Sequence, residues 1–114
     1  MNKIDGRLRG EVAAFVKAGY ADVLATVRSL ELLPDLVAEG PDHFSIQASG
    51  IGVPTIILTD FWDPLPTNRS EQVGWTLSVL DGEVLSQSER PTAEGVRRLI
   101  EPALRELKSH SSAA

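Results

Sequence analysis

Acidic side chains in the middle of the chain are the first candidates for chemistry in this sequence. Those that follow the most apolar segment are Asp60, Asp63, Glu71 and Asp81. Carboxylate oxygens are the ligands that Mg²⁺ prefers in proteins, so these residues could form a metal site at the end of a strand. Their spacing matches no metal-binding loop, and Asp63 precedes a proline and Asp81 a glycine, which are pairs typical of turns. We therefore interpret these carboxylates as structural and expect no metal and no cofactor.

Histidine and serine are the other residue types that catalysis uses. His43 lies beside a predicted turn and His110 near the C-terminus, so a catalytic triad or a two-histidine metal site would need distant parts of the chain. No serine stands in a Gly-x-Ser-x-Gly or Ser-x-x-Lys arrangement. The glycines at positions 50 and 52 precede a strand rather than a helix that could hold phosphate. The sequence predicts no catalytic residue and favours a protein that is not an enzyme.

The segment 61–66 is the best candidate for recognition of a partner. It places two aromatic residues before two prolines in the longest predicted loop, residues 61–72. Tryptophan is enriched at binding hot spots, and prolines reduce the ordering cost of association. Core capping by the two aromatic side chains is the simpler alternative. The candidate partner-binding residues are Phe61, Trp62, Asp63, Pro64 and Leu65.

Helical spacing of apolar residues predicts two helices before any strand. The first includes Val12, Phe15 and Val16 and stops near Gly19, because glycine accepts the left-handed conformation after a last turn. The second is expected over residues 20–33, where Pro34 ends it. These helices must cover whatever sheet follows.

Alternating and β-branched residues predict the sheet in the middle of the chain. A strand is expected at 43–48, with a hairpin around the turn before it, and a central strand at 55–59. The Asp-Gly pair at 81–82 indicates a two-residue hairpin turn that sets Val79 opposite Val84. The polar return strand at 83–88 is expected at an edge of the sheet.

An apolar stripe near the C-terminus predicts a last amphipathic helix that Pro91 or Thr92 opens and that packs on the sheet. Pro102 falls inside this pattern, where it costs about 3 kcal/mol unless the helix bends or restarts. Residues 109–114 are expected to be a disordered tail, which leaves one domain at 1–108. The predicted fold class is α+β, with N-terminal helices, an antiparallel meander of three to five strands, and the C-terminal helix on the sheet.

Composition limits the possible functions further. The 114 residues include 42% hydrophobic and 24% charged residues, as in ordinary folded chains, and contain no cysteine for disulfides, thiolate catalysis or zinc. The formal net charge of −5 disfavours nucleic acid and anionic lipid. The apolar runs are far shorter than the roughly 20 residues of a membrane span. We expect a cytoplasmic protein that binds neither nucleic acid nor membrane.

Three functions fit these observations. The leading hypothesis is a protein-binding or regulatory module with a protein partner, similar only in size, charge and element order to secretion chaperones or toxin-neutralising immunity proteins. An immunity role requires exposed carboxylates such as Asp60, Asp63 and Glu71 to cluster on one face. The second is a ligand-binding domain or small enzyme with a carboxylate site near Asp60 and Asp63, using His43. The third is a self-associating assembly subunit, possible as a homodimer, in which the strand 83–88 pairs with a neighbour.

Overall fold

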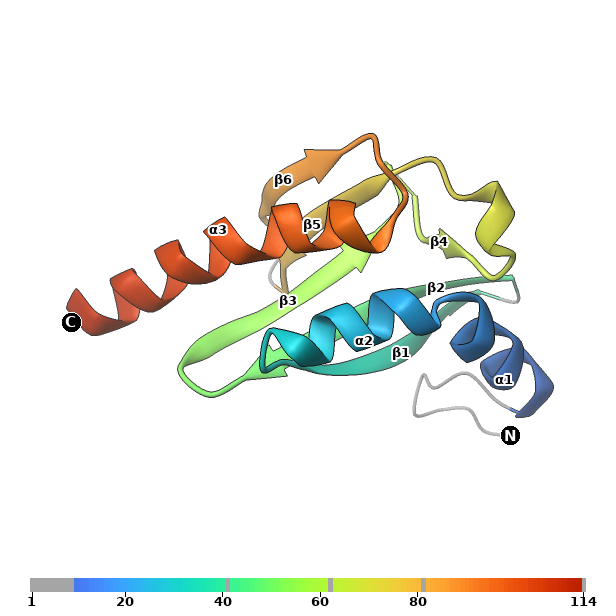
Figure 1. Ribbon diagram of the computed structural model, residues 1–114, viewed down its shortest axis with the longest axis horizontal. Helices are drawn as coiled ribbons and strands as arrows, with labels where there is room; N and C mark the ends of the chain where they lie inside the picture. Colours follow the sequence, from blue (N-terminus) through green and yellow to red (C-terminus); the bar gives the residue numbers. More distant parts are fainter. Residues whose placement is uncertain (1–9, 41, 62, 81, 114) are drawn as a thin grey trace.

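The architecture confirms the α+β class. The computed structural model describes residues 10–40, 42–61, 63–80 and 82–113, with side chains up to residue 107. In these residues the helices are α1 (Gly10–Gly19), α2 (Ala21–Ser29) and α3 (Ala93–Ala113), with a short 3₁₀ helix η1 (Arg69–Glu71). The strands are β1 (Leu33–Gly40), β2 (His43–Gly50), β3 (Val53–Thr59), β4 (Leu65–Pro66), β5 (Trp75–Val79) and β6 (Val84–Ser88). Figure 1 shows the helices lying over one face of the sheet.

The sheet is an antiparallel meander with the strand order β1-β2-β3-β5-β6. β3 is central, as its apolar, β-branched sequence predicts. The two-residue strand β4 pairs with the start of β2, where Phe44 lies opposite Leu65. It is a sixth strand inside the segment expected to be a loop, so part of that loop belongs to the sheet.

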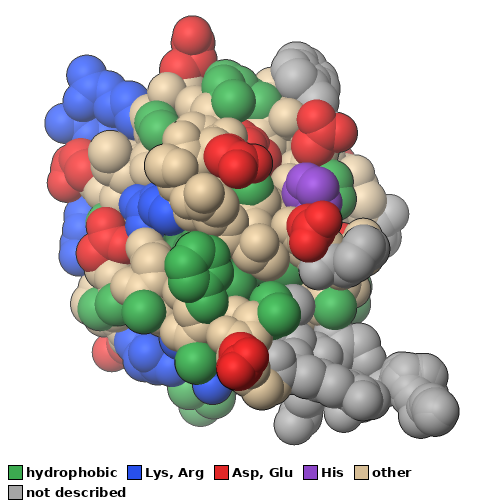
Figure 2. Space-filling model, turned by 90° about the vertical axis from the view of Figure 1, so that its right-hand side faces the viewer, with side chains coloured by type: hydrophobic (Ala, Val, Ile, Leu, Met, Phe, Trp, Pro, Cys, Tyr) green, Lys and Arg blue, Asp and Glu red, His purple; other side chains and the backbone are tan. Residues whose placement is uncertain are grey.

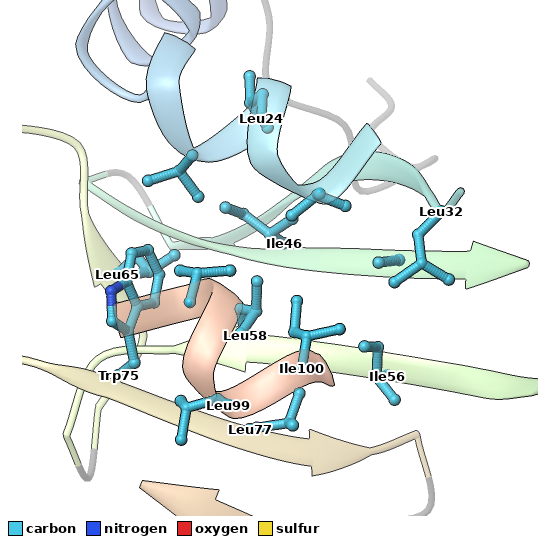
Figure 3. Packing of buried hydrophobic residues seen from close by; sticks show 14 of the residues in the cluster. Leu24, Leu32, Ile46, Ile56, Leu58, Leu65, Trp75, Leu77, Leu99 and Ile100 are labelled. Atoms are coloured by element: carbon cyan, nitrogen blue, oxygen red, sulfur yellow. The ribbon is translucent and has the colours of Figure 1, made fainter. Parts of the chain in front are cut away.

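The hydrophobic core lies between the sheet and the helices. Figure 3 shows Leu99 and Ile100 of α3 facing the strand residues Leu58 and Leu77. The largest side chains with almost no exposed surface are Trp75, Tyr20, Phe44, Ile46, Ile56, Leu58, Leu65, Leu77 and Ile100. Burial of one such side chain contributes about 1.5–3 kcal/mol to the stability of the fold.

The N-terminal half differs from the expectation at one boundary. α2 ends at Ser29 rather than at residue 33, and residues 33–40 form the edge strand β1, which pairs antiparallel with β2 in the hairpin predicted before residue 43. The chain reverses at Glu31, whose φ of 65° lies in the left-handed region, and this turn buries Leu32. Pro34 fits because an edge strand tolerates a residue without an N–H group. The β-branched residues of α2 make extension of the helix less favourable.

The hairpin between β5 and β6 is present, but its register changes part of the way along. Trp75 lies opposite Ser88 and Leu77 opposite Ser86, the pairs expected from the predicted turn. The Val79 N–H, however, donates a 2.9 Å hydrogen bond to the Glu83 carbonyl, so the turn is one residue longer than the two predicted. Val84 lies opposite Ser78, so the predicted pairing of Val84 with Val79 is wrong. The reason is a β-bulge, which inserts one extra residue into β6 near the turn. Asp81 of the turn lies outside the described residues.

The C-terminal helix packs on the sheet as predicted. Thr92 caps it, because the Thr92 hydroxyl accepts a 3.1 Å hydrogen bond from the Gly95 N–H. α3 continues through Pro102 without a restart. Side chains beyond residue 107 lie outside the described part, so the tail at 109–114 stays a prediction. None of the helices in the described ranges is long and apolar enough to cross a membrane.

Candidate functional site

A surface hollow of about 350 Å³ gathers acidic side chains from segments that are far apart in the sequence. We call it the acidic hollow. It is lined by Glu39, His43, Asp60, Asp63, Pro64, Pro66, Glu71 and Val73. These residues come from the end of β1, the start of β2, the end of β3 and the connection to β5. Figure 2 shows a face of the molecule on which acidic side chains surround a histidine, while basic side chains gather toward its other side.

Asp60 fixes the base of the loop that borders the hollow. Its carboxylate accepts hydrogen bonds from the backbone N–H groups of Phe61 at 2.7 Å, Val73 at 3.1 Å and Gly74 at 2.8 Å. The residue is only 6% exposed, so these three contacts satisfy a nearly buried carboxylate and close the loop between β3 and β5. Asp60 therefore has a clear structural role, as the sequence interpretation proposed.

Arg69 fixes the far end of the same loop. Its guanidinium donates to the Gly19 carbonyl at 2.9 Å and to the Pro91 carbonyl at 3.1 Å, and it forms a 2.9 Å ion pair with Asp22. It also lies over the Tyr20 ring, with 4.8 Å between the guanidinium carbon and the ring centroid. One side chain thus joins the loop to the α1–α2 junction and to the segment before α3.

Tyr20 completes the anchoring from inside the core. Its hydroxyl donates a 2.7 Å hydrogen bond to the Pro66 carbonyl, and its ring packs edge-on against Phe44 at 5.2 Å between centroids. Burial raises the pKa of the Tyr20 hydroxyl above its usual range, against the opposing charge of Arg69. The hydroxyl therefore stays protonated and remains a donor to the loop.

The ion pair between Asp22 and Arg69 affects the pKa of the Asp22 carboxyl. Burial alone would raise the pKa of Asp22, but the hydrogen bond and charge of Arg69 and the Val23 N–H outweigh it. The pKa of the Asp22 carboxyl is consequently lowered. Because the Asp22 side chain is 57% exposed, solvent screens much of this interaction.

The predicted partner-binding residues have different positions in the structure. Asp63 is exposed and Pro64 half-buried, and both line the acidic hollow. Phe61 is half-buried and its ring lies close to Gly74, where an added Cβ would approach it to 3.0 Å. Leu65 is fully buried in β4, so its side chain is part of the core and is not available to a partner. Trp62 lies outside the described residues.

The hollow offers negative charge and hydrogen-bond acceptors next to apolar surface. Asp63 and Glu71 are exposed, and Val73 beside them is 63% exposed. Glu39 is oriented by a 2.8 Å hydrogen bond from the Ser45 hydroxyl. Among the described residues there is no group of three or more His, Asp or Glu side chains placed to hold a metal ion. The arrangement can bind a cationic group and cover its apolar stem.

Three contributors to this site were not found from the sequence. Glu39 was missed because it was interpreted as a residue of the turn before β2 and not as a candidate for the site. Arg69 was missed because its partners lie as many as 50 residues away in the sequence. Val73 was assigned to the hairpin, although it ends the loop. The Asn68-Arg69-Ser70 segment did hold a usable signal, since Asn68 is a typical residue at the start of a helical turn.

Comparison with known proteins identifies no relative from which a function could be inferred. No family model, no curated protein and no solved structure matches this chain. The site is therefore interpreted from its geometry and charge alone.

Proposed function

We propose that this chain is a protein-binding module whose acidic hollow engages a basic segment of a partner protein. The observation that carries the proposal is the convergence of Glu39, Asp60, Asp63 and Glu71 on one hollow beside His43. The sequence hypothesis of an immunity-like role requires exposed carboxylates on one face. Asp63 and Glu71 are exposed at the hollow and support it, whereas Asp60 is only 6% exposed and holds the loop instead. A cytoplasmic address and a regulatory role are part of the same proposal.

Rigidity of the loop supports binding of a partner at this surface. The loop is held at its base by Asp60 and at its far end by Arg69, so its exposed residues are already positioned. A positioned surface loses little conformational entropy on association, which leaves more of the contact energy as affinity. The exposed side chain of Val73 adds apolar area beside the charges. Charge steers the encounter, and the apolar contact then holds the complex.

The first test is titration of the chain with a synthetic peptide rich in lysine and arginine, followed by NMR of the backbone amides. We expect the largest shifts at residues around the acidic hollow and weaker binding as salt concentration rises, because exposed charges are screened. The variant carrying Asp63→Lys and Glu71→Lys should bind the peptide at least tenfold more weakly. Shifts spread evenly over all acidic surfaces would contradict a specific site.

A matched control separates a local effect from net charge. Asp35 and Glu89 are exposed acidic residues that do not line the hollow. The variant carrying Asp35→Lys and Glu89→Lys has the same change in net charge and should retain the wild-type affinity. Equal losses in both variants would mean that only the overall charge attracts the peptide, and the proposal would be abandoned.

A small-ligand site is the second candidate, because His43, Asp60 and Asp63 line the same hollow. Asp60 is the weak member of this set, since its carboxylate already accepts three backbone hydrogen bonds. A small organic cation such as spermidine tests this alternative in the same NMR experiment. Saturable binding of spermidine at the hollow, without binding of the peptide, would favour the ligand site.

A further inference from the structure

Glu39 is the extra residue of a β-bulge at the end of β1. Ala38 lies opposite Phe44 and Gly40 lies opposite His43, so Glu39 stands between two paired positions without a partner of its own in the strand pairing. A bulge changes the direction of a side chain, and bulges are frequent beside functional sites. The Glu39 side chain lines the acidic hollow together with His43.

A buried hydroxyl group holds the Glu39 carboxylate in place. Ser45 is only 1% exposed, and its hydroxyl donates the 2.8 Å hydrogen bond to Glu39 Oε2. Loss of this bond would leave a buried hydroxyl without a partner, which is costly, so the bond keeps the two side chains in one arrangement. A carboxylate has about four acceptor positions on its two oxygens, and this bond uses one of them. Glu39 therefore presents a positioned carboxylate to the hollow, with acceptor positions left for a partner.

Carboxylates reach the hollow from both sides of the start of β2. Glu39 comes from β1, which pairs with one edge of this segment, whereas Asp63 and Glu71 come from the loop whose strand β4 pairs with the other edge. Pro64 and Pro66 add apolar lining. The hollow, at about 350 Å³, is smaller than one turn of an α-helix with its side chains, which occupies about 400 Å³. It therefore suits a single long side chain rather than a helix.

We infer that the hollow selects an arginine side chain of the partner over a lysine side chain, and that Glu39, positioned by Ser45, determines this selectivity. The inference rests on the proposed function. A guanidinium group is planar and has five N–H donors in a fixed fork, so it can form two parallel hydrogen bonds with a positioned carboxylate. It is also less strongly hydrated than an ammonium group and loses less when it contacts the two prolines. The ammonium group of lysine gains less from a fixed carboxylate orientation.

Two peptides of equal charge test the selectivity. One contains arginines separated by glycine and serine, and the other contains lysines at the same positions. NMR titration of the wild-type protein should give a dissociation constant about fivefold lower for the arginine peptide. Equal dissociation constants would overturn the selectivity and leave the proposed function intact, whereas absence of binding by both peptides would overturn both.

Two substitutions test the role of Glu39 through the ratio of the two dissociation constants. Glu39→Gln removes an exposed carboxylate, and Ser45→Ala removes the group that orients it without a change in net charge. Each should reduce the ratio to less than about twofold, and Ser45→Ala should leave the affinity for the lysine peptide unchanged. Circular dichroism confirms that the variants are folded.

The matched control is Asp63→Asn, which removes an exposed charge from the same hollow that Ser45 does not orient. It should weaken the binding of both peptides by the same factor and retain the fivefold ratio. A ratio that persists in Glu39→Gln, or one that falls equally in Asp63→Asn, would overturn the assignment of selectivity to Glu39.

Discussion

The loop from Asp60 to Gly74 and the adjacent β5–β6 hairpin are neighbours in the chain but are held in different ways. In the loop, buried or partly buried side chains bind distant backbone groups, with Asp60 at one end and Arg69 at the other. In the hairpin, strand pairing and the backbone conformation of the turn fix the structure. A segment with little regular structure is thus held by side-chain contacts instead of strand pairing. The loop carries exposed charges on these anchors, and the hairpin places β6 at the edge of the sheet.

Removal of the loop anchor should have the largest effect. Asp60→Ala leaves the N–H groups of Phe61, Val73 and Gly74 without their acceptor, and we expect a loss of about 3 kcal/mol in the free energy of unfolding. Urea denaturation measures this loss. Asp60→Asn keeps one carbonyl acceptor and should lose less. Equal stability of wild type and Asp60→Ala would show that the loop is held by other contacts.

The junction between loop and hairpin should be the next most sensitive position. A Cβ at Gly74 would lie 2.4 Å from the Ser88 carbonyl oxygen and 3.0 Å from the Phe61 ring. Gly74→Ala should therefore cost about 2 kcal/mol, because the backbone must move. The control is Gly19→Ala, whose added Cβ would make only an ordinary 3.7 Å contact with Arg69. A thermal melt should show a clear decrease for Gly74→Ala alone.

The hairpin turn should respond more weakly than the loop. Gly82 has a φ of +103°, which other residues adopt with strain, although no atom lies within 4 Å of an added Cβ. Gly82→Ala should cost about 1 kcal/mol from backbone strain alone. If Gly82→Ala proved more damaging than Asp60→Ala, the turn rather than the loop anchor would be the more important of the two.

The smallest effect should be the pH dependence of the Asp22–Arg69 ion pair. The pKa of Asp22 is lowered in the folded protein, so its contribution is present above the ordinary value of 3.8 and is lost as pH falls through the lowered value. The stability difference between wild type and Asp22→Asn should thus be larger at about pH 6 than at about pH 3. In an Arg69→Met background this difference should become smaller, because only the hydrogen bond from the Val23 N–H then remains to the Asp22 carboxylate.

Local patterns were sufficient to predict most elements of this fold. Apolar periodicity located α1, α2 and α3, and the Asp-Gly pair located the hairpin. The hairpin of β1 with β2 was predicted from the turn between them. The start of β1 was missed because Pro34 disfavours helix and strand alike, and only the position at an edge makes it acceptable. The bulge in β6 was missed because the Asp-Gly pair predicts where the chain turns and not the register of the strand that follows, in which Leu85 packs against the core.

The acidic hollow was predictable only in part. Asp60, Asp63 and Glu71 were identified from their neighbourhood in the sequence, and the structure brings them together. Glu39 and Arg69 were not identified, because their positions depend on strand pairing and on contacts over long sequence separations. Local sequence predicts which charges a loop carries. It does not predict which distant residues hold that loop in place.

The loop uses different residues for its anchors and for its exposed surface, and this separation affects how its sequence can change. The residues that anchor it, Asp60 and Arg69, are separate from the exposed residues Asp63 and Glu71 that border the hollow. Substitutions at the exposed positions leave the anchors intact and so cost little stability. Descendants of this chain could therefore change the charge of the hollow, and with it the partner, while they inherit the same loop conformation.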